Sequence, residues 1–270
     1  IVDKSMGSTL VKGSISALNY AEKLSGLIQG IFIAAINTVM YPIFSREAIK
    51  EDHEGLKKTI IQSINLILLI TVPSAMAMMI LSTPIVKIAF ERGEFDRVAT
   101  LMTSSALTFT TVRMISGSIN MSLNNVYYSL KDTKTPLIIS MFSVVVNIVL
   151  NLVLIRPLKH NGLALATSVS SIFGMIVSIY FLRKKLGSFG FKASVIVFIK
   201  TFIASLIMGA VVFFTHSYLV NRFVMTKVLE LVILLSVSLL GLVIYLILIY
   251  IFDVEELNFF IGTLKKRLKG

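Results

Sequence analysis

Long apolar runs separated by short charged segments dominate the hydrophobic pattern of the chain. The stretch from Leu24 to Ser45 contains no charged residue, and a helix of about 20 residues crosses a hydrocarbon layer of about 30 Å. Similar runs predict further helices, so the full set of predicted spans is 14–48, 59–81, 98–130, 136–155, 162–182, 201–217 and 231–252. The pattern predicts an all-α integral membrane protein with seven spanning helices.

Prolines and one arginine interrupt these runs. Pro42 and Pro73 predict kinks, because proline removes a helical hydrogen bond and neighbouring groups then satisfy the freed carbonyl. The break at 82–84 predicts a short interfacial helix that ends near Phe90. Arg113 divides the run from 98 to 130, but neither half reaches about 18 residues, so we predict one long helix there.

A polar face is predicted on the first helix. Small and polar residues recur there at steps of three, four or seven, namely Asn19, Lys23, Gly26, Gly30, Asn37 and Tyr41. On a regular helix these residues lie along one side. Lipid disfavours such a face, so we expect it to contact other helices or a wet cavity. A transport path and plain packing through small residues both fit this pattern.

Polar faces recur on the next helices and are absent from the last pair. The third, fourth and fifth spans carry aligned polar and small residues, which are Arg113, Gly117, Asn120, Asn124 and Lys131, then Ser140, Ser143, Asn147 and Asn151, then Thr167, Ser171, Gly174 and Ser178. The last two spans offer small residues such as Gly209 and Gly241, which suit close packing. A cargo with a polar head and a lipid tail would use this division, and a channel with two peripheral helices would also show it.

Composition supports the membrane class. Hydrophobic residues make up 56% of the 270 residues and charged residues 15%, which excludes an ordinary soluble domain. The net charge of +12 comes mostly from short loops, so it predicts membrane topology and no nucleic-acid partner. The chain begins at Ile1 without an initiator Met, and we expect a preceding segment.

No catalytic or metal-binding pattern is found in the sequence. There is no Cys, and His53, His160 and His216 lie in or beside three different loops without metal-ligand spacing. A phosphate-binding glycine loop and a nucleophile motif are also absent from the sequence. We therefore predict a protein that is not an enzyme and holds no metal or cofactor. Glu22 lies next to Lys23 and is one candidate partner for it; the alternative is that Lys23 contacts a cargo.

Basic residues in the loops predict the orientation. Alternate loops carry fourteen of them on one side, at Arg46, Lys50, Lys57, Lys58, Lys131, Lys134, Arg183, Lys184, Lys185, Lys192, Lys265, Lys266, Arg267 and Lys269. The opposite loops carry nine, at Lys4, Lys12, Lys87, Arg92, Arg97, Arg156, Lys159, Arg222 and Lys227. The richer side is predicted to be cytoplasmic, which places the C-terminus inside.

Four longer motifs connect the chain to a known family. GSISALNYAEKL, QGIFIAAINTVMYPIFSR, PIVKIAFERGEFD and YYSLKDTKTP resemble the second half of the MurJ/MviN family of lipid II flippases, within the multidrug/oligosaccharidyl-lipid/polysaccharide exporter superfamily. The resemblance implies fourteen spanning helices in two six-helix lobes plus a final pair. Residues 1–12 would then end a preceding helix, 13–186 form five spans of the second lobe, 192–252 the final pair, and 253–270 an amphipathic helix on the cytoplasmic surface.

The resemblance also implies a site and a function. Lys23 replaces a functionally important Arg of the family, and Arg113 stands where relatives are usually uncharged. Many relatives carry basic residues where this chain has Met121 and Asn125. The expected head-group cavity contains Lys23, Asn19, Asn37, Arg113, Asn120, Asn124 and Asn147, and the expected lipid-tail groove contains Gly209 and Gly241.

The function implied is alternating-access flipping of lipid II across the bacterial cytoplasmic membrane. The partners would be undecaprenyl-diphosphate-linked disaccharide-peptide and membrane lipids, with the protein a monomer. Alternatives are an exporter of another lipid-linked oligosaccharide or polysaccharide unit, and a drug/cation antiporter of the same superfamily. Without a first lobe, this chain alone is expected not to transport.

Overall fold

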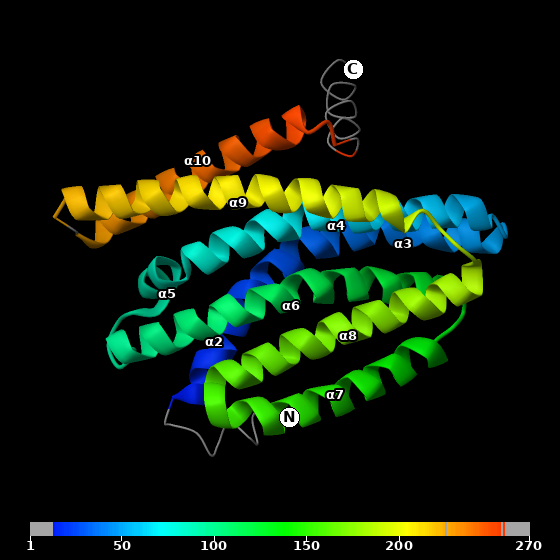
Figure 1. Ribbon diagram of the computed structural model, residues 1–270, viewed down its shortest axis with the longest axis horizontal. Helices are drawn as coiled ribbons and strands as arrows, with labels where there is room; N and C mark the ends of the chain where they lie inside the picture. Colours follow the sequence, from blue (N-terminus) through cyan, green and yellow to red (C-terminus); the bar gives the residue numbers. More distant parts are fainter. Residues whose placement is uncertain (1–12, 225, 255, 257–270) are drawn as a thin grey trace.

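The computed structural model describes residues 13–224, 226–254 and 256, which form a bundle of long helices (Figure 1). The helices in chain order are α2 Ser14–Ile28, η1 Gln29–Ile33, α3 Ala34–Ile49, α4 His53–Ile80, α5 Ser82–Phe90, α6 Arg97–Ser129, α7 Lys134–Leu158, α8 His160–Leu186, α9 Phe191–Arg222 and α10 Lys227–Ile251. The predicted all-α class is confirmed. Residues 1–12 and most of 253–270 lie outside the described part, so the predictions made for them stay predictions.

Six helical segments in the described part are long and apolar enough to cross a membrane. They are 14–49, which joins α2, η1 and α3, together with α4, α7, α8, α9 and α10. Helix α6 has 33 residues, which is ample length, but hydroxyl and amide side chains and Arg113 make it too polar to qualify by composition. The predicted span 98–130, and with it the count of seven, therefore stays a prediction.

The helices form layers that run from a peripheral helix to an apolar pair. Helices α9 and α10 lie together along one edge of the bundle, α7 lies at the opposite edge, and α6 and α8 lie between (Figure 1). Helix α7 packs mainly against α8, and α9 packs against both α4 and α10. Helices α6 and α7 barely touch, so a space remains between them that α8 bridges from one side.

A π-helical turn changes the buried face of the first spanning segment. Before η1 the buried residues include Ala17, Ala21 and Leu24; a regular repeat of about 3.6 residues would next bury Phe32 and Val39. Those side chains are 47% and 64% exposed, and the buried set after the turn is Ile33, Asn37, Met40 and Phe44. One extra residue in η1 has advanced the buried face by one position.

This turn overturns part of the predicted polar face. Lys23 is exposed and Gly30 is exposed, whereas Asn37 is only 8% exposed and lies on the buried side. Neither amide atom of Asn37 has a hydrogen-bond partner in the described structure. The prediction of one continuous polar side was wrong at Asn37, because it assumed an unbroken α-helical repeat.

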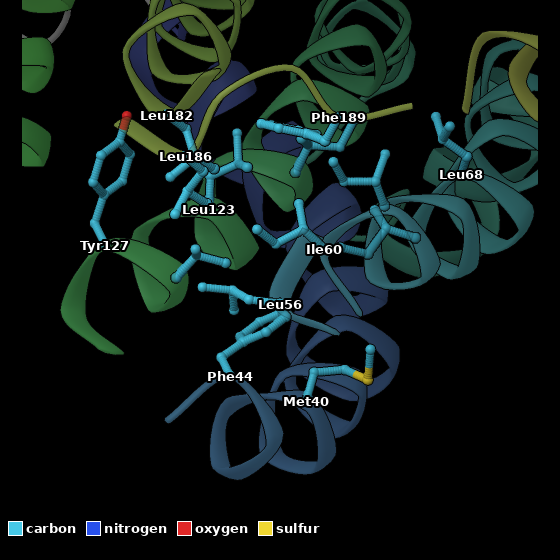
Figure 2. Packing of buried hydrophobic residues seen from close by; sticks show 14 of the residues in the cluster. Met40, Phe44, Leu56, Ile60, Leu68, Leu123, Tyr127, Leu182, Leu186 and Phe189 are labelled. Carbon is cyan, nitrogen blue, oxygen red and sulfur yellow. The ribbon is translucent and has the colours of Figure 1, made fainter. Parts of the chain in front are cut away.

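The largest hydrophobic cluster joins α3, α4, α6 and α8. Phe44, Leu56, Ile60 and Leu123 are almost fully buried in it. Figure 2 shows these side chains pointing into one space between the helices, and Phe189, from the connection between α8 and α9, borders that space at the end opposite Phe44. Leu56 and Ile60 are one turn apart on α4, so both reach the same neighbours. This cluster holds α6 and α8, which line the candidate site with other faces, against α3 and α4.

The proline in α4 is accommodated by a donor from α10. Pro73 has no N–H, so the carbonyl of Leu69, four residues earlier, loses its normal helical donor. The hydroxyl of Tyr245 donates to that carbonyl at 2.8 Å, and Tyr245 is 4% exposed. Helix α4 continues through Pro73 from His53 to Ile80, and the bond ties the last helix to the bundle.

The connections are shorter than the charged segments of the sequence predict. Only Lys159 separates α7 from α8, and its φ of 52° reverses the chain. Helix α8 then returns so closely that a Cβ on Gly162 would lie 2.3 Å from the carbonyl oxygen of Leu154, so glycine is required there.

Between α6 and α7, Asp132 accepts from the backbone N–H and the hydroxyl of Thr135 at 3.0 and 2.8 Å. Asp132 also forms an ion pair with Lys185 at 2.8 Å, which joins this loop to the end of α8. Burial opposes ionisation of the Asp132 carboxyl, but the bonds from Lys185 and Thr135 outweigh it and lower its pKa to about 2. The carboxylate thus stays charged at neutral pH, and the pair holds the α6–α7 connection against α8.

Candidate functional site

A polar cavity of about 340 Å³ lies between α6, α7 and α8. Helix α8 forms its floor because it packs against both neighbours, whereas α6 and α7 stay apart. The polar faces predicted on the third, fourth and fifth spans converge on this space. Its lining residues are Arg113, Asn120, Asn124, Pro136, Ile139, Ser140, Ser143, Val144, Asn147, Thr167, Ser170, Ser171, Gly174 and Ser178.

The polar side chains of this cavity are cross-linked to one another. The amide of Asn120 donates to the carbonyl of Ser171 at 3.0 Å, and the hydroxyl of Ser116 donates to that of Ser171 at 2.9 Å. On the other wall, the amide of Asn147 donates to Thr167 Oγ1 at 3.3 Å. These bonds hold amide and hydroxyl groups at fixed positions, as a site that recognises sugar or phosphate oxygens requires.

Arg113 supplies the positive charge of the cavity lining. Its Nη1 donates to Glu22 Oε1 of α2 at 3.0 Å, and the two side chains are 43% and 48% exposed. Glu22 as the candidate partner of Lys23 is wrong, because adjacent residues on a helix point about 100° apart. Lys23 Nζ instead lies 5.3 Å from the centre of the Tyr20 ring, within the range of a cation–π contact.

The predicted head-group residues thus lie in three places: the cavity lining, helix α2 and the core. Arg113, Asn120, Asn124 and Asn147 line one cavity. Lys23 is exposed on α2 and Asn19 is half-buried there; both lie outside this lining, and α2 reaches it through the bond from Arg113 to Glu22. Asn37 lies in the core, beyond the π-helical turn.

Two contributors were missed in the sequence. Glu22 was considered only as a partner for Lys23, although its partner is Arg113, 91 residues away. Gln29, in the π-helical turn, donates its amide to the carbonyl of Met114 at 3.2 Å, which anchors that turn to α6 beside Arg113. A glutamine inside an apolar run was the available signal for such an anchor.

Gly209 and Gly241, the two predicted tail-groove residues, lie at helix contacts. A Cβ on Gly209 would lie 2.6 Å from Ile80 Cδ1 of α4, and one on Gly241 would lie 2.7 Å from Val212 Cγ2 of α9. Open apolar space lies elsewhere, in a cavity of about 350 Å³ bounded by α4, α6, α8 and α9 and lined by residues that include Leu68, Ile119, Met175 and Phe198.

No metal centre is apparent in the described part of the chain. Among residues 13–224, 226–254 and 256, no group of three or more His, Cys, Asp or Glu side chains is placed to hold a metal ion. The chemistry of the cavity is that of hydrogen bonding and a guanidinium charge.

Comparison with known proteins gives a consistent result. A family model described as lipid II flippase MurJ matches residues 1–234. Probable lipid II flippases MurJ of Rickettsia prowazekii and Haemophilus influenzae are 31% and 30% identical over 62% and 79% of this chain, which correspond to 33% and 43% of those proteins. Lipid II flippase MurJ of Thermosipho africanus is 29% identical over 92% of this chain and 48% of its own length.

A solved structure of lipid II flippase MurJ in an inward closed conformation also resembles this chain. The TM-score is 0.77 at 29% identity, and the match covers 93% of this chain and 50% of that one. The chain thus spans half or less of the length of these relatives.

Proposed function

The chain belongs to the MurJ family of lipid II flippases, and we propose that it supplies the second lobe and final helix pair of a protein that flips lipid II by alternating access. In this proposal residues 13–186 form the lobe and 192–252 the pair. The cargo is an undecaprenyl-diphosphate-linked disaccharide-peptide, and transport requires a first lobe in addition to this one.

The observation that carries the proposal is the polar cavity between α6, α7 and α8. It combines a guanidinium with amide and hydroxyl groups, which suit the diphosphate and the sugar–peptide part of the head group. Lys23 adds a second cation nearby on α2. A cationic lining favours an anionic diphosphate over a cationic drug, so the drug/cation antiporter is the weaker alternative. Another lipid-linked oligosaccharide would satisfy the same groups, and the named relatives favour lipid II over it.

For the polyprenyl tail we propose the apolar cavity beside α9. Its lining is almost wholly hydrocarbon and comes from both the lobe and the final pair, so a chain lying there would touch both parts. Gly209 and Gly241 would then serve the packing that positions α9. A photoreactive polyprenyl diphosphate should label peptides containing Met175 and Phe198, and labelling confined to α7 would contradict this placement.

The protein is a multi-pass membrane protein of the family, and we propose a cytoplasmic C-terminus in the bacterial inner membrane. The excess of basic residues in the loops on that side supports this orientation. The head group would enter the cavity from the cytoplasmic side and leave it outside, with a monomer as the working unit.

Lys23 provides the test of the proposed function. An ammonium at membrane depth without a counter-charge is costly, and Lys23, which is exposed on the spanning segment 14–49, forms no ion pair among the described residues. We propose that its partner is the diphosphate. Lys23→Arg in the full-length protein should support growth when the native flippase is depleted, whereas Lys23→Gln and Lys23→Ala should fail at normal membrane levels.

The control is Lys58→Gln, which removes a lysine charge at the start of α4, away from the cavity lining. It should complement fully. If Lys23→Gln also complements fully, Lys23 does not contact the head group, and the charge of Arg113 alone would have to account for anion recognition.

A further inference from the structure

The charges at the junction of α2 and α6 do not balance. Glu22 and Lys23 are adjacent on α2, and Arg113 reaches Glu22 from α6. Glu22 is bonded to Arg113, and Lys23 lies over Tyr20, so the junction holds two cations and one carboxylate. This junction therefore keeps a net positive charge beside the polar cavity, and the carboxylate is committed to the arginine that lines it.

The Glu22–Arg113 pair is poorly suited to a structural role. Both side chains are close to half exposed, so close packing does not lock the pair and its two members can take other partners. Among the described contacts, Arg113 donates to this carboxylate through Nη1 alone, which leaves the rest of its donor fork available. A phosphate can accept two parallel bonds from a guanidinium and carries more charge than a carboxylate.

From this geometry we infer that Glu22 is a resident counter-ion that holds Arg113 at the cavity until an anionic diphosphate replaces it. Glu22 is then a positioning residue that sets affinity, and Arg113 is the residue that touches the head group. The carboxylate competes with the diphosphate, so it lowers affinity and favours release on the far side. This inference rests on the proposed function and adds a residue to it.

Removing the carboxylate while keeping its shape tests the competition. We expect Glu22→Gln to raise the affinity of the full-length protein in detergent for undecaprenyl diphosphate by about two- to fivefold, the upper part of the range for removing one exposed charge partner. Arg113→Gln should lower it about tenfold. Titration followed by native mass spectrometry measures both. Glu22→Asp should stay near wild type, because the carboxylate is retained.

The decisive measurement is the double variant. If Glu22 acts through Arg113, Glu22→Gln should change affinity less than about twofold in the Arg113→Gln background. Glu54→Gln is a matched control, since Glu54 forms an exposed pair with Lys57 at 2.7 Å near the α3–α4 turn, and it should leave affinity unchanged.

The outcomes distinguish failure of the counter-ion role of Glu22 from failure of the proposed flippase function. An equal gain from Glu22→Gln with and without Arg113 would mean a general field effect and overturn the counter-ion role. So would a loss of affinity, or no change at all, in a protein whose wild type binds. A full-length wild type that binds neither undecaprenyl diphosphate nor lipid II would overturn the proposed function, and this inference with it.

Discussion

Replacing Tyr245 by Phe tests how α4 accommodates its proline. The carbonyl of Leu69 has lost its helical donor to Pro73 and receives the hydroxyl of Tyr245 at 2.8 Å instead. The variant keeps the aromatic ring, which packs in the cluster between α9 and α10, and removes only the donor. The Leu69 carbonyl is then left without that partner inside the bundle.

The expected cost follows from this single unpaired acceptor. A lost hydrogen bond changes the free energy of unfolding by about 0.5–1.5 kcal/mol, and leaving a buried polar group unpaired costs about 1–3 kcal/mol. We therefore expect Tyr245→Phe to destabilise the full-length protein by about 1–3 kcal/mol. For a protein of about twice this length the shift is roughly 1 °C per kcal/mol, so the apparent Tm should fall by about 1–3 °C. Size-exclusion chromatography of detergent-solubilised protein after heating measures this.

A second substitution makes the test specific. Pro73→Ala restores a backbone N–H four residues after Leu69, so its carbonyl regains a donor within α4. In that background Tyr245→Phe should cost less than about 0.5 kcal/mol. Tyr250→Phe, at a side chain that is 67% exposed on α10, should be neutral. An equal cost for Tyr245→Phe with and without Pro73 would refute the reasoning.

Two further predictions concern topology and the core. Single cysteines at Ser45, Ser129 and Ser188 should resist a membrane-impermeant thiol reagent in whole cells, whereas cysteines at Asn161 and Asn221 should react, and the reverse pattern would invert the proposed orientation. Asn37→Leu should raise the unfolding free energy by about 1–3 kcal/mol because it removes two unpaired buried polar atoms; Asn19→Leu, at a half-buried position, is the control, and a destabilised Asn37→Leu protein would point to an unseen partner for the amide.

Most of the fold could be predicted because the length and hydropathy of membrane helices distinguish them from other segments. The predicted helix 98–130 and the short helix ending at Phe90 correspond to α6 and α5 within a residue or two. The charged segments were predicted to be longer loops than they are, since amphipathic helix ends such as His53–Lys58 continue the helix beyond the apolar run. The periodicities of α6, α7 and α8 were regular, so their polar faces were predicted together and meet at one cavity.

The remainder depended on local geometry that periodicity cannot express. One additional residue in the turn at Gln29–Ile33 shifts the buried face of α3 by one position relative to that of α2. Nothing in the sequence QGIFI distinguishes a π-helical turn from an α-helical one. The partner of Glu22 was equally hidden, because it depends on how α2 and α6 are placed against each other. Such pairings across 91 residues are set by tertiary packing rather than by spacing along the chain.

Helix α6 has consequences for how the protein is made. Thr103, Thr111 and Ser118 are among its buried polar residues, and α2, α4, α5 and α8 surround it. If it spans the membrane, as predicted for 98–130, it would leave the ribosome as a segment that lipid accepts poorly on its own. Assembly with the neighbouring helices, rather than partitioning of a single helix, would then decide whether this segment enters the membrane, and entry would wait until α8 has been synthesised.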